Sequence, residues 1–115
     1  MELTRYEKPM AIEQLLFKVR PDMVQKFLEL DNEIWTKKLA TYPGYVSKEV
    51  WVSQTVPGDI ITMIYWSDIK LWEAIDQNEL VEVDRRFYEA MGEGTFKFYK
   101  ALHEENQFFK ISEYK

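Results

Sequence analysis

Hydrophobic and other side chains alternate along residues 11–19, AIEQLLFKV, as they do in a β-strand with two different faces. One face carries Leu15, Phe17 and Val19, and the other carries Ile12, Gln14, Leu16 and Lys18. The pattern therefore predicts a first strand over these residues.

Helical spacing follows directly after this strand. Pro21 suits the first position of a helix, where its missing N–H group costs nothing, and Asp22 with Gln25 forms an alternative capping box. The apolar residues then recur every three or four positions as Val24, Phe27, Leu28, Ile34, Trp35, Leu39 and Tyr42. The Pro43-Gly44 pair ends this first predicted helix.

Two further strands are predicted over residues 45–53 and 60–66, joined by a hairpin connection at TVPGD. The second of them, IITMIYW, is apolar on both faces apart from Thr62. A strand of this kind is usually central in its sheet and covered on both sides.

The second half of the chain predicts another helix and a last strand. Ser67 is a candidate N-cap for a helix with Ile69, Trp72 and Ile75 on its inner face, and Asp76 with Glu79 forms a second capping box. The helix resumes with Leu80, Val83, Phe87 and Met91 and ends at GEG. Residues 95–105 favour a short helix, and residues 108–114 are expected to form the final strand.

The predicted order, β-α-β-β-α-(α)-β, is that of the split βαβ, ferredoxin-like pattern. We therefore expect an α+β fold with a four-stranded antiparallel sheet and both helices on one face. Residues 11–115 are expected to form one domain, preceded by a short polar lead over residues 1–10. Because the other face of the sheet is also apolar, we expect a second copy to cover it in a homodimer that forms an α+β barrel.

Composition narrows the classes of function. The chain has 115 residues, a net charge of −5, an aromatic share of 16% and no cysteine. The acidic balance argues against nucleic acid and anionic membranes as partners, and the lack of cysteine excludes disulfides and thiolate catalysis. With no secretory signal and no apolar run of membrane-spanning length, we expect a soluble, cytoplasmic protein.

Asp31 is the first candidate for chemistry, since it lies inside the apolar stripe of the first predicted helix. One interpretation is that Asp31 faces solvent or accepts a structural hydrogen bond. The other is that Asp31 is a general base, with a pKa that is raised by burial beside Trp35. Trp35 and Trp51 are either core residues or the lining of a site. Lys48 and Glu49 are neighbours on a strand, so one of them must face the interior, where a charge needs a partner or a function.

Other polar residues carry simpler interpretations. Arg85 and Arg86 fit a solvated helix face, and His103, the one histidine, lies in a surface-like stretch. The chain lacks the clustered ligands of zinc or iron sites, a glycine-rich phosphate loop and a Ser-His-Asp arrangement, so we expect no metal and no cofactor.

Two segments carry a resemblance to a known family. YPGYVSKEVW and, after the hairpin, ITMIYWSDIKLWEAI resemble the dimeric α+β barrel superfamily that includes the antibiotic-biosynthesis monooxygenase-like proteins. The resemblance covers residues 11–91. The stretch DNEIWTKKLATYPGYVSKEVW is similar to a small, mainly cyanobacterial branch of that superfamily without an assigned activity.

The resemblance implies several activities, because its members include cofactor-free oxygenases of aromatic substrates, isomerases, haem-degrading monooxygenases and proteins with no known reaction. Haem degraders have a tryptophan and a later histidine in the second helix. The corresponding positions here hold Ile75 and Arg85, so we expect that haem is not degraded.

Three functions follow as alternatives. The first is a cofactor-free monooxygenase or isomerase acting on a small aromatic or polyketide-like molecule, in which Asp31 or Glu49 moves a proton while Trp35, Trp51, Tyr65 and Trp66 shape the cavity. The second is a non-catalytic module that binds a small molecule or a partner, and the third is haem binding without degradation. We expect Asp31, Trp35 and Trp51 to approach one another in space.

Overall fold

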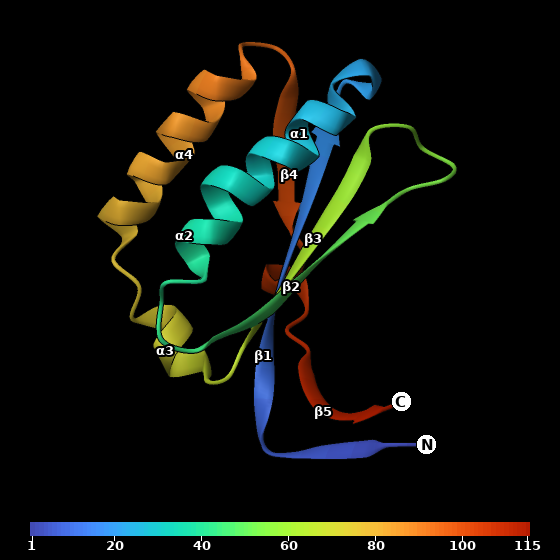
Figure 1. The fold of residues 1–115 in the computed structure, drawn as a ribbon, viewed down its shortest axis with the longest axis vertical. Coiled ribbons are helices and arrows are strands. Elements are labelled where there is room, and N and C mark those ends of the chain that lie inside the picture. The colour runs from blue at the N-terminus through green and yellow to red at the C-terminus, as the bar shows by residue number, and fades with distance from the viewer.

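The computed structural model describes residues 1–115, which form a five-stranded antiparallel sheet with helices packed on one face (Figure 1). The strands are β1 (Leu3–Val19), β2 (Tyr45–Val52), β3 (Asp59–Trp66), β4 (Phe96–Ala101) and β5 (Phe109–Tyr114). Their order is β2-β3-β1-β4, and β5 pairs with the remaining length of β1. The α+β, ferredoxin-like architecture predicted from the sequence is confirmed.

The sheet has one strand more than predicted, because residues 96–101 form β4 rather than part of a short helix. Phe98 and Phe96 of β4 pair with Phe17 and Val19 of β1, so tertiary pairing outweighs the helical spacing of this segment. The expected short helix is confined to α5 (Leu102–Glu105).

Strand β1 begins at Leu3, eight residues earlier than the alternating pattern indicated. Its first half pairs with β5, as in Leu3 opposite Tyr114, and the backbones of Glu2 and Lys115 exchange two hydrogen bonds of 2.6 Å. The two chain ends therefore lie side by side (Figure 1). This half of β1 is mostly polar, so apolar and polar residues do not alternate there and no strand was predicted.

The first predicted helix runs over four consecutive segments: η1 (Pro21–Met23), α1 (Val24–Leu30), the π-helical η2 (Asp31–Thr36) and α2 (Lys37–Leu39). The second is divided into α3 (Ile69–Glu73) and α4 (Gln77–Met91). Asp68, not Ser67, caps α3 by accepting from Lys70 N at 2.9 Å, and Asp76 caps α4 by accepting from Asn78 N at 2.9 Å. None of the helices is long and apolar enough to cross a membrane.

Two buried clusters hold the helices on the sheet. One contains Ala11, Leu39, Ile64, Trp66 and Ile75, and the other contains Val19, Phe27, Ile60, Phe87 and Met91. Trp35 packs against both clusters, so its position ties the middle of the first helical stretch to the sheet.

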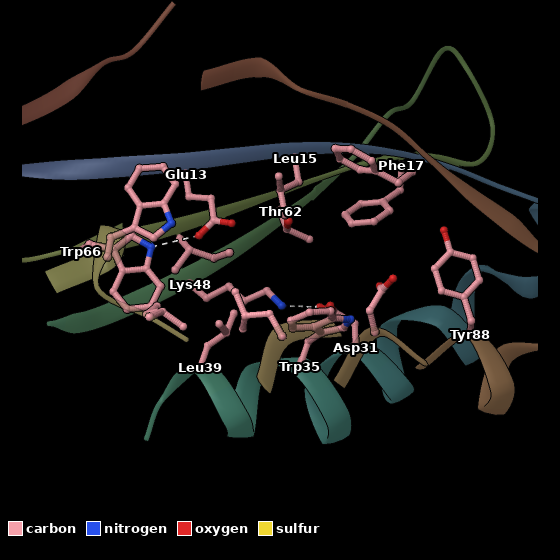
Figure 2. A pocket seen from close by; sticks show the side chains of 16 residues that line it. Glu13, Leu15, Phe17, Asp31, Trp35, Leu39, Lys48, Thr62, Trp66 and Tyr88 are labelled. Carbon is pink, nitrogen blue, oxygen red and sulfur yellow. Dashed lines mark hydrogen bonds and ion pairs between the residues drawn. The ribbon is translucent and has the colours of Figure 1, made fainter. Parts of the chain in front are cut away.

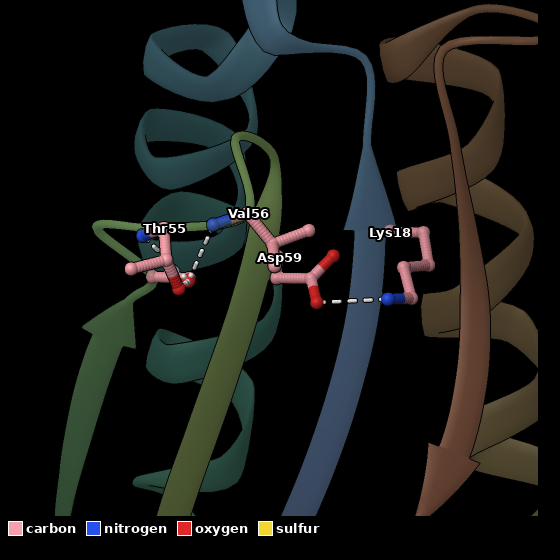
Figure 3. Close-up of polar contacts among 5 residues, drawn as sticks. Lys18, Thr55, Val56 and Asp59 are labelled. Atoms are coloured by element: carbon pink, nitrogen blue, oxygen red, sulfur yellow. Dashed lines mark hydrogen bonds and ion pairs between the residues drawn. The ribbon is translucent and has the colours of Figure 1, made fainter.

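The β2–β3 hairpin is closed by polar contacts (Figure 3). The Ser53 hydroxyl accepts from the backbone N–H groups of Thr55 and Val56 at 3.2 and 3.0 Å. Lys18 on β1 donates to Asp59 at 2.8 Å, which fastens the start of β3 to its neighbour. Gly58 has a φ of +90°, and its carbonyl accepts from Val19 N at 2.8 Å.

The outer face of the sheet, which carries no helix, has its own buried cluster of Met10, Ile12, Met63 and Tyr65. Tyr6, from the first half of β1, packs against this cluster, and the Lys110 ammonium group of β5 lies 4.9 Å from the Tyr65 ring. The terminal strands thus cover part of this face within one chain. Trp51, on the same face at the edge of the sheet, stays 53% exposed.

Candidate functional site

A cavity of about 270 Å³ lies between the sheet and the helices (Figure 2). Eleven of its sixteen lining residues are hydrophobic. Six aromatic side chains contribute to the wall: Phe17, Trp35, Trp66, Trp72, Tyr88 and Phe98. The volume is close to the lower end of the range of small-molecule sites, roughly 300–1,000 Å³, so it suits a ligand of one or two rings.

A buried ion pair lies in the cavity wall. Lys48 Nζ on β2 donates to Asp31 Oδ2 at 2.7 Å and to Thr36 Oγ1 at 2.9 Å. The side chains of Lys48 and Asp31 are 5% and 7% exposed, so the pair is screened from bulk solvent. Asp31 is therefore an acceptor for a buried cation, and neither group is left uncompensated.

The π-helical segment positions both Asp31 and Trp35. Within η2 the Lys37 backbone N–H bonds to the carbonyl of Asn32, five residues earlier, and Thr36 Oγ1 donates to the Asp31 carbonyl at 3.3 Å. The wider turn changes which side chains face the sheet compared with a regular α-helix. Asp31 and Trp35, four residues apart within this segment, both line the cavity.

A second carboxyl group, that of Glu13 on β1, enters from the sheet. Its Oε1 accepts from Trp66 Nε1 at 3.0 Å, and Trp66 is fully buried. Glu13 and Lys48 both pair with Ile64 of β3, from opposite sides, and so lie in one cross-strand row. Figure 2 shows both side chains on the cavity side of the sheet.

Burial controls the protonation of these carboxyl groups. It raises the pKa of Glu13, against the opposing effects of the Trp66 hydrogen bond and the Lys48 charge. It also raises the pKa of Asp31, which the contact with Lys48 partly offsets. At the α4 side of the cavity, burial raises the pKa of Asp84 and of Tyr88. Burial therefore favours the neutral form of these groups, which makes them candidates for proton transfer.

The structure brings together only some of the residues singled out from the sequence. Asp31, Trp35 and Trp66 line the cavity. Glu49, Trp51 and Tyr65 lie on the outer face of the sheet, where Tyr65 donates to Glu49 at 3.2 Å.

The predicted approach of Trp51 to Asp31 is therefore wrong. Lys48 points into the cavity, and alternation along β2 sends Glu49 and Trp51 the other way. A register shift between Tyr45 and Ser47 helps to set which residues face the helices.

The polar residues of the site that sequence reasoning missed include Glu13, Thr36, Asp84, Tyr88 and, as a site residue, Lys48. Glu13 had a readable signal, because it shares the face of Leu15, Phe17 and Val19, where a carboxylate is unexpected. Thr36 had none, since its approach to Lys48 depends on the π-helical turn.

Ile75 and Arg85, the two positions compared with haem-degrading proteins, lie in different environments. Ile75 lines the cavity, whereas Arg85 lies on the solvent side of α4 in ion pairs with Glu82 and Glu89 at 2.8 and 2.6 Å. His103 packs on Trp72, with ring centroids 4.9 Å apart, and its Nδ1 accepts from Gln14 N at 3.2 Å. No histidine lines the cavity.

Comparison with known proteins gives likenesses of structure. No family model matches the chain, and no curated protein matches it. A candidate antibiotic biosynthesis monooxygenase from Bordetella bronchiseptica superposes with a TM-score of 0.59 at 14% identity, covering 93% of this chain and 97% of that one. SnoaB, a cofactor-independent oxygenase from Streptomyces nogalater, gives 0.57 at 14% identity, covering 81% and 93%.

A further candidate antibiotic biosynthesis monooxygenase, from Caulobacter crescentus, superposes with a TM-score of 0.56 at 17% identity, covering 82% of this chain and 91% of that one. At such identities the likeness establishes a shared fold. This chain therefore shares its fold with these three proteins.

Proposed function

We propose that the cavity binds a small aromatic molecule and that the chain acts on it as a cofactor-free monooxygenase or isomerase. The observation that carries this proposal is the combination of an apolar, aromatic-lined cavity with a buried carboxyl group, Asp31, at its wall. Burial raises the pKa of Asp31, which favours proton exchange with a bound molecule. The fold shared with SnoaB supports the same class of reaction.

The proposed roles follow from position. Asp31 moves the proton, while Trp35 and Trp66 shape the cavity and contact the ring system. Glu49, Trp51 and Tyr65 lie on the other face of the sheet, so their proposed part in the same site has no geometric support. The mainly cyanobacterial branch suggested by the sequence stays a prediction, as does a cytoplasmic location.

The non-catalytic alternative has one observation in its favour. The Asp31 carboxylate is already paired with Lys48 at 2.7 Å, and this satisfies both groups without any ligand. Haem binding without degradation has less support, because no histidine lines the cavity and its volume of about 270 Å³ suits smaller ligands.

The test is a panel of one- and two-ring phenols and ketones, screened by thermal shift and then by oxygen uptake in buffer containing a chelator. We expect stabilisation by two-ring compounds that Trp35→Ala reduces, and oxygen uptake that Asp31→Asn abolishes. Binding without oxygen uptake or isomerised product would support the non-catalytic module. If no compound raises the melting temperature, the proposed site is wrong.

A further inference from the structure

Glu13 and Lys48 form a pair of polar groups across the floor of the cavity. Each is the registered partner of Ile64, from β1 and β2 respectively, so their backbones lie two strand spacings apart, about 10 Å. Both side chains are long, lie on the helix side of the sheet and line the cavity. The two side chains therefore enter one cavity from either side of Ile64, with Glu13 directed toward Trp66 and Lys48 toward Asp31, as Figure 2 shows.

Each group has hydrogen-bonding capacity that the protein does not use. Glu13 Oε1 accepts from Trp66 Nε1, whereas Oε2 has no protein partner. No fully enclosed side-chain atom of the chain lacks a partner, so this oxygen has accessible surface, and the surface available to it is that of the cavity. Lys48 uses two of its three N–H donors, on Asp31 and Thr36.

The charges of the wall favour a neutral Glu13. The one cation in the lining, Lys48, is already matched by Asp31, and Asp84 adds a further carboxyl group. An ionised Glu13 would be a buried anion with only the indole N–H as its partner, and such a group is stabilised by taking up a proton. A carboxyl group kept neutral in this way becomes a hydrogen-bond donor.

We infer that Glu13, as a neutral carboxylic acid, and the free N–H of Lys48 form a two-donor site for the carbonyl oxygen of an aromatic ketone or its enol tautomer. This inference rests on the proposed function, because it presumes that the cavity takes an aromatic ligand. Glu13 is then a ligand-binding residue, and the two donors stabilise negative charge on the ligand oxygen.

The inferred site selects ligands by charge as well as by shape. An aromatic ketone offers the acceptor that both donors need. An aromatic carboxylate brings an anion next to Asp31 and Asp84, and an aromatic amine offers no acceptor and requires Glu13 to ionise.

Four probes with one ring system separate these cases: 2-acetylnaphthalene, 2-ethylnaphthalene, 2-naphthoate and 2-(aminomethyl)naphthalene. Their binding to the whole chain is measured by calorimetry. We expect the ketone to bind about tenfold more tightly than the hydrocarbon, and the carboxylate and amine to bind more weakly than the ketone. Infrared difference spectra should show a lowered carbonyl stretch for the bound ketone.

The matched variants are Glu13→Gln and Glu13→Leu. A glutamine imitates the neutral acid, because its carbonyl still accepts from Trp66 while its amide donates into the cavity. Glu13→Gln should therefore keep the ketone preference within about threefold and keep the lowered stretch. Glu13→Leu should lose both. Glu13→Leu could fail to fold because the Trp66 N–H loses its acceptor. In that case the ketone preference and the carbonyl stretch measured with Glu13→Gln still test the inference.

Three results would overturn the inference. Equal binding of ketone and hydrocarbon would show that no donor acts on the oxygen. Tightest binding of the amine, lost in Glu13→Gln, would show that Glu13 is an anion that binds cations. Loss of ketone binding in Glu13→Gln would show that the carboxylate form is needed. Failure of all four probes to bind would instead refute the aromatic site itself, and the inference with it.

Discussion

Among single residues, the cavity combines three carboxyl groups, those of Glu13, Asp31 and Asp84, with one ammonium group in a wall that is otherwise mainly apolar. Asp31 accepts a hydrogen bond from the ammonium group of Lys48, whereas Glu13 accepts one only from the indole N–H of Trp66. The two acids therefore differ in what burial does to them. Asp31 keeps a charged partner, whereas Glu13 relieves its burial most simply by remaining protonated.

This difference predicts an unusual pH dependence. The folded-state pKa of Glu13 is raised above 4.5, so between that value and the raised pKa the folded chain binds more protons than the unfolded chain. Stability contributed at this position is therefore present at low pH and is lost as pH rises through the folded pKa. The side-chain amide in Glu13→Gln cannot ionise, so we expect this variant not to lose stability as pH rises through that range.

The measurement is the melting temperature of wild type and Glu13→Gln by calorimetry from pH 5 upward. The advantage of the variant should be small at pH 5 and should grow with pH, and a change of 1 kcal/mol moves the melting temperature of a domain this size by roughly 3–5 °C. The groups that face Glu13 from the packed elements are Lys48, Asp31, Asp84 and Tyr88. A difference that is constant with pH would contradict the raised pKa.

Among elements, the π-helical segment η2 is the one that the site depends on most. A π-helical turn in an α-helix is usually one inserted residue, retained because the flanking turns keep their register. Asn32 and Glu33 are exposed, while Asp31 and Trp35 face the cavity. The exposed part of this segment therefore makes little contribution to packing, and the side chains on its inner face line the cavity.

Deletion of Asn32 should convert this segment into regular α-helix. We expect the variant to fold with a melting temperature within about 5 °C of wild type, since the turns on either side keep their contacts. Binding of 2-acetylnaphthalene should fall about tenfold or more, because removing a residue between Asp31 and Trp35 shifts these two side chains relative to each other at the cavity wall.

The control is deletion of the exposed Glu82 in α4, a regular helix. This deletion shifts Val83, Phe87 and Met91 off the buried face, and it should lower the melting temperature far more than deletion of Asn32 does. Equal damage from both deletions would show that η2 is needed for the fold itself.

The β2–β3 hairpin offers a second test at the same scale. Gly58 and Gly94 both have positive φ, of +90° and +75°. A Cβ on Gly58 would lie 1.9 Å from the Val19 carbonyl oxygen, whereas one on Gly94 has nothing within 4 Å. Gly94→Ala should cost roughly 1–2 kcal/mol of unfolding free energy for its backbone conformation alone.

Gly58→Ala should cost at least about 1 kcal/mol more than Gly94→Ala, because the hairpin must move away from β1. Urea denaturation of both variants gives the comparison. Equal losses would mean that the close approach of Gly58 to Val19 is not maintained in solution.

The sequence predicted those elements whose pattern is local. Alternation gave the core part of β1, and the Pro43-Gly44 pair gave the end of the first helical stretch. The π-helical turn, strand β4 and the first half of β1 depend on partners far along the chain, so no local pattern indicated them. The same limit separated Trp51 from Asp31, since one residue of strand register decides which face a side chain takes.

At the scale of the whole molecule, the outer face of the sheet is the surface through which we predict a homodimer. Part of it is covered by the terminal strands, which bury Met63 and Tyr65 to 7% exposure. Trp51, 53% exposed, is left beside this cover. The predicted homodimer through the sheet faces would cover Trp51, and it stays a prediction.

We expect light scattering to show a dimer at micromolar concentration, and Trp51→Glu to convert it to a monomer without changing the helical circular dichroism signal. A charge introduced into an apolar contact is strongly unfavourable, whereas the same change on the opposite side of the molecule is not. Val81→Glu on α4, at a side chain 69% exposed, is the control and should remain dimeric. A monomeric wild type would contradict the prediction.

The pairing of Leu3–Ala11 with β5 also determines when the sheet can be completed during synthesis. The edge formed by residues 3–11 stays unpaired until residues 109–114 are synthesised, so this contact joins segments far apart in the sequence. An open edge on a nascent chain invites pairing with other chains. The stretch RYEKP at residues 5–9, which contains three charged residues and a proline, lies on that unpaired edge and discourages such pairing until its partner strand is synthesised.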